Sequence, residues 1–321
     1  MKRRVHYVLS THWDREWYQT FQDFRYRLVK LLDHVITGWQ DGRLKGPFQT
    51  DGQAIILEDY LEIRPERREL VEQLARDGNF VFGPWYVLPD EFTVSGESLI
   101  RNLRLGREVA LSLGAEPSAA GFVCDIFGHN SQMPQILTGF GIKGGFIWRG
   151  TNTHGKRNVL WKGADGTILP CFRFGLIGSC AFAARVRAAR EPSSCESEPQ
   201  AFLARLDEYL NAETALTDVD PLLAFDGCDH QGWDQAMYAT LLERMESDHG
   251  DFEIIHSSLD GFLDEMLPQQ ARIQTKLEGE LREPGWETRQ AGQDAWEVDQ
   301  QWLIPGVLSS RMRLKQANSV C

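Results

Sequence analysis

Several carboxylates and imidazoles of this chain stand directly after short apolar runs, and Asp125 is the clearest of them. The apolar run 121–124 ends abruptly at Asp125, and a turn-prone segment follows at 128–130. A helix is predicted from Ser131, which would cap it, with Pro134 in the first turn. A lone aspartate at a strand end more often only caps a turn. Because α/β proteins place their chemistry at such strand ends, Asp125 is nevertheless a candidate site residue.

His12 and Asp14 form a second feature, just after the predicted strand 5–10. They are two residues apart, so both side chains point the same way in an extended segment. An imidazole and a carboxylate so placed suit zinc or another divalent ion, although the pair alone is a weak signal. Together with Asp125 they would make a site with three nitrogen and oxygen ligands.

Asp229 offers a second carboxylate, after the predicted strand 221–225 and beside His230. Two carboxyl groups across a cleft are what glycoside hydrolysis requires, since one attacks or activates water and the other protonates the leaving oxygen. Aromatic residues near the same strand ends could stack on sugar faces, with packing at the rim as the equal alternative. They are Trp13, Trp17, Trp85 and Tyr86.

The elements that must position these residues alternate along the chain. Strands are predicted at 5–10, 47–50, 80–83, 121–124, 145–148, 221–225 and 252–255. Helices are predicted at 21–39, after Asp51-Gly52 through Ile63, and at 66–76, 97–113, 131–140, 233–245 and 258–266. Strand then helix, repeated about seven times, predicts an α/β fold with a parallel sheet. With this many units, we expect an irregular seven-stranded (β/α) barrel, closed or nearly closed, over residues 1–270.

In a parallel barrel the strand ends share one face, so residues scattered over the chain should converge there. Those expected at this face are His12, Asp14, Asp51, Trp85, Asp125, Arg149 and Asp229.

Three segments fall outside the alternation. Residues 159–172 predict a β-hairpin that turns at Asp165-Gly166 and is inserted between units. Residues 187–199 lack periodicity and predict a mobile loop. Residues 271–321 are expected to connect the barrel to the first part of a truncated helical domain, with a helix near 306–318 capped by Ser309 or Ser310.

Composition narrows the function. The 321 residues are 42% hydrophobic and 25% charged, as in ordinary globular proteins. A net charge of −12 argues against nucleic-acid and anionic-membrane partners. No stretch reaches transmembrane length, and the apolar run after the basic residues 2–4 is too short for a signal peptide. The six cysteines show no CxxC spacing, which predicts reduced thiols in the cytoplasm.

Four motifs, in this order, resemble those of a known family. They are His12-Trp-Asp-Arg-Glu-Trp17, Asp125-Ile-Phe-Gly-His-Asn-Ser-Gln-Met-Pro134, Gly227-Cys-Asp-His-Gln231 and Gly306-Val-Leu-Ser-Ser-Arg311. They are similar to motifs of the family-38 glycoside hydrolases, the zinc-dependent retaining α-mannosidases. The likeness covers essentially the whole chain and is closest to the bacterial branch with 2-O-mannosylglycerate hydrolases. The family's seven-stranded barrel agrees with the number of units predicted above.

The resemblance implies roles for the site residues. His12 and Asp14 would bind zinc, or another divalent metal. Asp125 would be both a ligand and the nucleophile, and Asp229 the general acid and then the base. Trp17 would pack against the bound mannose. The other residues expected to contact substrate are Asp51, Trp85, Arg149 and His230, with bracing of Asp229 as the alternative role of His230.

The family takes a fourth zinc ligand, a histidine, from a helical domain after the barrel, and no residue here matches it. We therefore expect a truncated member whose partner is a mannoside of undefined linkage, with homo-oligomers left open. Two other functions compete. A carbohydrate-binding fragment would lack turnover. A metal-dependent polysaccharide deacetylase would need a second pair of histidines closely spaced on a helix, and this chain does not have one.

Overall fold

A parallel sheet built around the first strand forms one half of the fold. The structure, a computed structural model, describes residues 2–151, 155–187, 199–247, 250–283, 303 and 306–318. The first sheet contains β1 (Arg3–Ser10), β2 (Phe48–Gln49), β3 (Phe80–Val81), β8 (Leu222–Asp226) and β9 (Phe252–His256). Its order is β3-β2-β1-β8, and β9 also pairs with β1. All these pairings are parallel.

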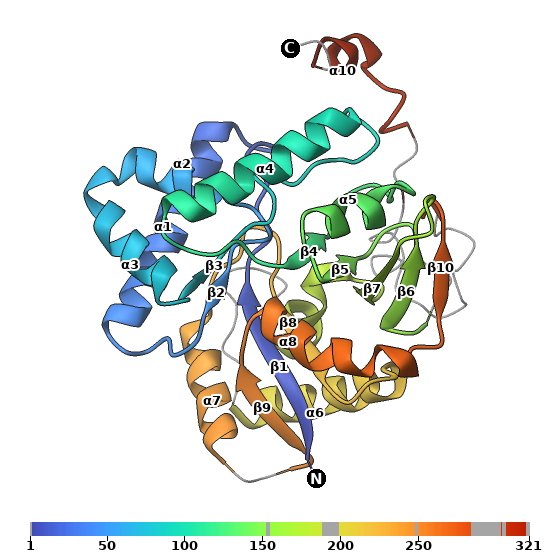
Figure 1. Cartoon of the computed structure of the whole chain (residues 1–321). Coiled ribbons are helices and arrows are strands. Elements are labelled where there is room, and N and C mark those ends of the chain that lie inside the picture. Colours follow the sequence, from blue (N-terminus) through green and yellow to red (C-terminus); the bar gives the residue numbers. More distant parts are fainter. Residues whose placement is uncertain are drawn as a thin grey trace.

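A second five-stranded sheet lies beside the first (Figure 1). It contains β4 (Ala120–Val123), β5 (Gly144–Ile147), β6 (Asn158–Lys162), β7 (Ile168–Arg173) and β10 (Lys276–Glu278). Its order is β10-β6-β7-β5-β4, and β6 and β7 pair antiparallel. The predicted hairpin 159–172 is thus confirmed. It is a continuous part of this sheet, because β7 pairs in parallel with β5.

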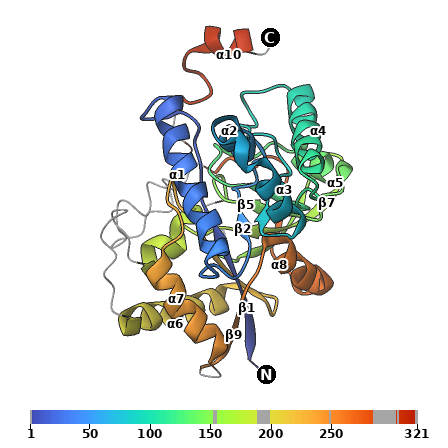
Figure 2. The ribbon, with the colours of Figure 1, turned by 90° about the vertical axis from the view of Figure 1, so that its left-hand side faces the viewer.

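Helices surround the two sheets (Figures 1 and 2). They are α1 (Phe21–Gln40), α2 (Ile55–Ile63), α3 (Arg68–Arg76), α4 (Gly96–Ser112), α5 (Met133–Gly139), α6 (Pro199–Leu216), α7 (Gln235–Glu246) and α8 (Leu259–Met266). Shorter helical turns are η1 (Pro65–Arg67), η2 (Gly178–Cys180), η3 (Ala183–Arg187) and η4 (Leu267–Arg272). The last helix, α10 (Met312–Asn318), lies apart from both sheets in Figures 1 and 2. None of the helices in the described ranges has the length and apolar character needed to cross a membrane.

The sequence explains the boundaries of the best-defined helices. Thr20 and Asp23 form a capping box at the start of α1, and its buried face carries leucine, valine and phenylalanine at helical spacing. Ser95 caps α4, and its side chain accepts a hydrogen bond from Ser98 N. Ser131 does not cap α5, because that helix starts at Met133 after Gln132, although Pro134 does lie in its first turn.

The predicted alternation of strand and helix is confirmed, whereas the predicted seven-stranded barrel, closed or nearly closed, is not confirmed, because the structure shows no closed barrel. The successive units are β1–α1, β2–α2, β3–α4, β4–α5, β5–α6, β8–α7 and β9–α8. Within the described ranges, no ladder joins the two sheets. At the junction between β3 and β4, β3 is only two residues long. Near its end, Ser118 N donates a backbone hydrogen bond to Phe82 O (3.1 Å). The indole N–H of Trp85 donates a second hydrogen bond across the junction, to Phe122 O (3.1 Å).

Aromatic side chains of the two sheets pack against one another in the core between them. Phe122 of β4 and Phe225 of β8 stack with ring centroids 5.4 Å apart, and Phe174 packs edge-on against both. All three side chains are buried. Packing of these rings therefore sets the relative position of the two sheets.

Three further segments differ from the predicted elements or lie outside the described residues. Helix α6 (Pro199–Leu216) had not been predicted from the sequence. The predicted mobile loop at 187–199 lies almost entirely outside the described residues. The predicted helix near 306–318 begins only at Met312, after Arg311, so Ser309 and Ser310 precede it and do not cap it.

Candidate active site

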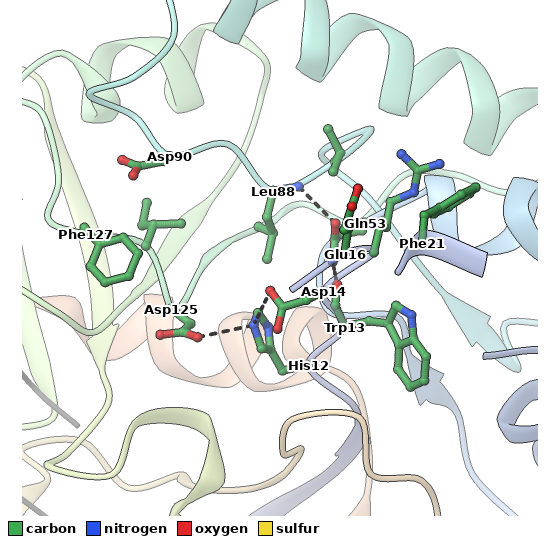
Figure 3. A pocket seen from close by; sticks show the side chains of 13 residues that line it. His12, Trp13, Asp14, Glu16, Phe21, Gln53, Leu88, Asp90, Asp125 and Phe127 are labelled. Atoms are coloured by element: carbon green, nitrogen blue, oxygen red, sulfur yellow. Dashed lines mark hydrogen bonds and ion pairs between the residues drawn. The ribbon is translucent and has the colours of Figure 1, made fainter. Parts of the chain in front are cut away.

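A cleft of about 540 Å³ opens at the carboxyl ends of the strands, where the two sheets meet. His12 and Asp14 of the segment after β1 line it, and Asp125 of the segment after β4 lies opposite them (Figure 3). Asp90 and Phe127 form the far wall of the same cleft. The predicted convergence of strand ends is confirmed for these residues.

Strand register places His12 next to Asp229. The β1 and β8 strands pair Val5 with Leu222 and Leu9 with Asp226. The same register continues past the strand ends, where His12 and Asp229 form an isolated parallel bridge. His12 N donates to Cys228 O (3.1 Å), and His230 N donates to His12 O (2.8 Å).

The same rule places Arg149 next to Asp125 in the second sheet. The β4 and β5 strands pair Phe122 with Phe146 and Val123 with Ile147. Two residues further on, the Arg149 Nε donates to Asp125 Oδ1 at 2.7 Å, and a second guanidinium nitrogen contacts the same oxygen. This bond leaves Asp125 Oδ2 directed toward His12 Nε2, 3.3 Å away.

The His12 imidazole lies among three carboxylates. Its Nδ1 is 2.8 Å from Asp51 Oδ2, while its Nε2 is 3.6 Å from Asp14 Oδ1 and 3.3 Å from Asp125 Oδ2. Burial by itself lowers the pKa of His12, but Asp51, Asp125 and Asp14 together raise that pKa well above its usual value. Without a metal, the ring therefore carries a positive charge in this site.

Asp125 and Asp14, the two cleft carboxylates beside His12, are ionised because positively charged groups surround them. Burial raises the pKa of Asp125, but the neighbouring His12 imidazole and then the Arg149 guanidinium outweigh it and lower that pKa to about 2. The pKa of Asp14 is also lowered, because the neighbouring imidazoles of His12 and His230 outweigh burial. Both oxygen ligands are thus deprotonated at neutral pH.

The residues present fit a divalent cation. Both ring nitrogens of His12 are buried and make no well-aligned hydrogen bond, although carboxylate oxygens surround them. A buried nitrogen left without a hydrogen bond beside ionised carboxylates is the environment that a cation such as zinc would satisfy. Ligand atoms of His12, Asp125 and Asp229 all lie within 4.8 Å of one another, so Asp229 borders the same position.

His230 holds Asp14 in place and is itself enclosed. Its Nε2 accepts a hydrogen bond from Asp14 N (3.2 Å) and lies 3.2 Å from Asp14 Oδ2. The ring packs against Trp13 and Phe24, and only 2% of its side chain is exposed. Neither predicted role, substrate contact or brace for Asp229, matches these contacts.

Two other residues predicted to contact substrate, Trp85 and Asp51, are enclosed by protein. Trp85 is fully buried, and its indole donates to a backbone oxygen between the sheets. Asp51 is fully buried as well, and its Oδ2 accepts from Trp13 N (2.9 Å) and Gln53 Nε2 (3.0 Å) while facing His12. Their physical role is to hold the strand ends and the imidazole, since neither exposes surface to a ligand.

Trp17 differs from these residues because 67% of it is exposed. It lies outside the lining of the cleft, edge-on to Tyr18 (5.1 Å between centroids) and beside His230 (6.4 Å). Its predicted contact with a sugar stays a prediction.

Three supporting residues were not predicted from the sequence. Glu91 is buried and lies 2.9 Å from His129 Nδ1, and it accepts from Asn130 N (2.7 Å), so it anchors the segment that follows Asp125. Gln53 joins Asp51 to the Trp13 carbonyl across the cleft floor. Cys180 donates to Asp229 Oδ1 (3.4 Å) from the distant turn η2. Only the Gln53 position, two residues after Asp51, carried a sequence signal.

Backbone conformation marks the same site. Asp51, Asp125 and His230 adopt φ of 52°, 58° and 54°. This left-handed region is uncommon for residues other than glycine, although aspartate and histidine enter it more readily than most, and it often occurs at functional sites.

An α/β scaffold whose strand ends bring together two carboxylates beside a cation position has the arrangement of a glycoside hydrolase. Residues 2–280 match the Glycosyl hydrolases family 38 N-terminal domain. The chain belongs to this family.

Individual relatives agree with this assignment. A protein of Halalkalibacterium halodurans, provisionally named mannosylglycerate hydrolase, is 30% identical over 337 aligned positions, covering 100% of this chain and 35% of that protein. Alpha-mannosidase G of Dictyostelium discoideum is 27% identical over 51% of this chain and 15% of its own length. The crystal structure of an alpha-mannosidase from Enterococcus faecalis V583 superposes with a TM-score of 0.77 at 29% identity, covering 89% of this chain and 32% of that one. The chain thus spans about a third or less of the length of these relatives.

Proposed function

We propose that this chain carries the catalytic centre of a zinc-assisted α-mannosidase that retains the configuration of the sugar. The observation that carries the proposal is the separation of two carboxylates, because an oxygen of Asp125 and an oxygen of Asp229 lie within 4.8 Å of each other. Retaining glycosidases hold their two carboxyl groups about 5 to 5.5 Å apart, whereas inverting ones hold them about 6.5 to 9.5 Å apart. The close spacing favours direct attack by one carboxylate.

Asp125 is the proposed nucleophile. Its ionised carboxylate attacks the anomeric carbon, while protonated Asp229 gives its proton to the glycosidic oxygen and the aglycone leaves. Asp229, now a carboxylate, takes a proton from water, and that water displaces Asp125 from the same carbon. Two displacements restore the original configuration.

The surroundings of Asp125 suit this role. Arg149 binds Oδ1 through its guanidinium, which fixes the plane of the carboxylate and leaves Oδ2 facing the cleft. The low pKa of Asp125, about 2, keeps it ionised and able to attack at any physiological pH.

His12, Asp14 and Asp125 are the proposed metal ligands, and Asp51 and His230 hold the first two in place. A bound zinc ion, or another divalent ion, would supply Lewis-acid contact to hydroxyls of the sugar. Asp51 accepts from Trp13 N and faces Nδ1 of His12, so the ring presents Nε2 to the cleft.

The proposed substrates are mannosides with an α-linkage, 2-O-mannosylglycerate or an α-manno-oligosaccharide, as the names of the relatives suggest. Trp17, exposed at the rim, is the proposed stacking surface for a sugar ring.

The test follows hydrolysis of aryl α-mannosides by NMR, with zinc content measured on the same protein. We expect α-mannose as the first product, and β-mannose would contradict a retaining mechanism. A second series compares mannosylglycerate with a panel of mannobioses. The Asp125→Asn variant is the control, and mannoside binding without any turnover by the native chain would support the carbohydrate-binding alternative instead.

A further inference from the structure

Two cysteines from distant parts of the chain meet beside Asp229. Cys180 belongs to the turn η2, and Cys228 follows strand β8, 48 residues later. Both are free thiols and both are partly exposed. Their sulfurs are 2.6 Å apart, closer than two unbonded sulfur atoms normally approach.

The thiols form a short chain of donors that ends on Asp229. Cys228 donates to the sulfur of Cys180, and Cys180 donates to Asp229 Oδ1 at 3.4 Å. The bond from Cys228, then burial, then the charge of Asp229 raise the pKa of Cys180, so this thiol keeps its proton. The donated hydrogen bond is therefore part of the environment of Asp229 in the reduced protein.

The other free cysteines of the described ranges are placed differently. Cys124 and Cys171 are buried, and burial raises the pKa of each to about 12. Such thiols are chemically inert. Cys180 and Cys228 combine partial exposure with a partner thiol within reach, two features of cysteines that form reversible disulfides.

We propose that Cys180 and Cys228 are a modification site, a pair that closes to a reversible disulfide and thereby changes the action of Asp229. The effect on catalysis rests on the proposed function of Asp229 as acid and base. The formation of the disulfide does not.

The reaction is a thiol–disulfide exchange with a low-molecular-weight disulfide. One cysteine, as thiolate, attacks a sulfur of the reagent, forms a mixed disulfide and releases one thiol. The second cysteine attacks the protein sulfur of that mixed disulfide and releases the second thiol. The protein loses two protons and two electrons, and the reagent gains them and is reduced to two thiols.

Separation of the sulfurs favours a disulfide over metal binding by the same group. Cys180, Cys228 and Asp229 could together offer three ligand atoms to a cation. Two thiolates on one tetrahedral zinc ion are about 3.8 Å apart, because each zinc–sulfur bond is about 2.3 Å. A disulfide bond is about 2.05 Å. The sulfurs at 2.6 Å are nearer to the second value.

Oxidation removes the donor that Asp229 uses. The sulfur of Cys180 facing Oδ1 then has no proton to give, and Cys228, the residue before Asp229, becomes tied to η2. We expect the oxidised protein to transfer a proton to the leaving group less effectively. Substrates with poor leaving groups should therefore slow about tenfold or more, and activated aryl mannosides much less.

The experiment oxidises the full chain with oxidised glutathione, blocks the remaining thiols with iodoacetamide and maps the peptides by mass spectrometry. Activity on poor and activated mannosides is measured before oxidation, after it, and after reduction with dithiothreitol. Cys228→Ser is the matched variant, since it cannot form the bond but keeps the Cys180 thiol beside Asp229. Cys180→Ser keeps a hydroxyl at that place. Each is compared with its own untreated form.

We expect a peptide joined through Cys180 and Cys228. We also expect oxidation to lower the activity on mannosides with poor leaving groups, reduction to restore that activity, and neither variant to show the loss. Absence of that peptide while other thiols react would overturn the modification site, whatever the activity. If the joined peptide forms but activity on mannosides with poor leaving groups does not fall selectively, the proposed effect of the disulfide on Asp229 is wrong. Because the peptide map needs no turnover, an inactive chain still decides the first question.

Discussion

The two sheets bring different chemistry to one cleft by the same geometric device. In the first sheet, the β1–β8 register continues past the strand ends and sets His12 beside Asp229. In the second, the β4–β5 register continues in the same way and sets Arg149 beside Asp125. The neighbours decide the chemistry: His12 and the Arg149 guanidinium keep Asp125 ionised, whereas Asp229 accepts a hydrogen bond from a thiol. The register of two parallel strands can thus set which residues stand side by side in the segments that follow the strands.

Removing the carboxylate of the second sheet should have the largest effect. Asp125→Ala is expected to lower turnover about 10⁴-fold or more and to weaken metal binding, because one group serves both purposes. Turnover and metal content are measured together. Asp90→Asn, at the far wall of the cleft, is the control. Unchanged metal content in Asp125→Ala would separate the two roles.

Removing the carboxylate of the first sheet should be selective. Asp229→Ala is expected to slow mannosides with poor leaving groups about 10²-fold to 10⁴-fold, while activated aryl mannosides lose far less, since only the former need protonation. The measurement is kcat/KM across a series of leaving groups. Equal losses along the series would argue against an acid/base role.

Weakening the partner of Asp125 should have an intermediate effect. Arg149→Lys keeps the charge but cannot hold one oxygen through two guanidinium nitrogens, so the carboxylate should lose its fixed orientation. We expect turnover to fall about 10²-fold with little change in thermal stability. A variant as active as the native chain would show that charge alone suffices.

The smallest expected effect concerns stability at the far edge of the first sheet, where His256 ends β9. Its Nε2 donates to Pro47 O (2.8 Å), its Nδ1 accepts from the Tyr238 hydroxyl (2.7 Å), and burial lowers its pKa to about 4. The unfolded chain therefore binds more protons than the folded one between about pH 6.5 and 4, and stability falls as the pH falls through this window.

The resulting loss should be roughly 1 to 3 kcal/mol of unfolding free energy by pH 4. Urea unfolding at several pH values measures it, with His256→Gln as the variant that should remove most of this pH dependence. The same slope in both proteins would assign the acid sensitivity to other groups.

Local sequence signals predicted most of the elements. The spacing of Phe24, Leu28 and Val35 and the Thr20 cap fix α1 by interactions within about one turn, so they are readable from the chain. The strand-end positions of His12, Asp14, Asp125 and Asp229 followed from the same kind of signal. Their convergence needed only the rule that parallel strands end on one face.

Nonlocal packing decided the rest. The type of Trp85 suggested a sugar contact, but α4 lies so close that a side chain at Gly106 would meet the Trp85 backbone, and the ring is enclosed. A glycine inside a long predicted helix was the one available signal of that approach. Closure of the barrel also depends on pairing between distant segments, and no ladder joins the two sheets within the described ranges.

The left-handed backbone at Asp51, Asp125 and His230 has a consequence for protein engineering. In a library selected for folding alone, these positions should accept glycine and asparagine and reject valine, isoleucine and threonine, whose branched side chains fit such a backbone poorly. The same narrow choice would recur at three unrelated places in the chain. The main chain therefore limits the substitutions available at these three positions. A library that aims at a new activity would have to vary the residues that line the cleft instead.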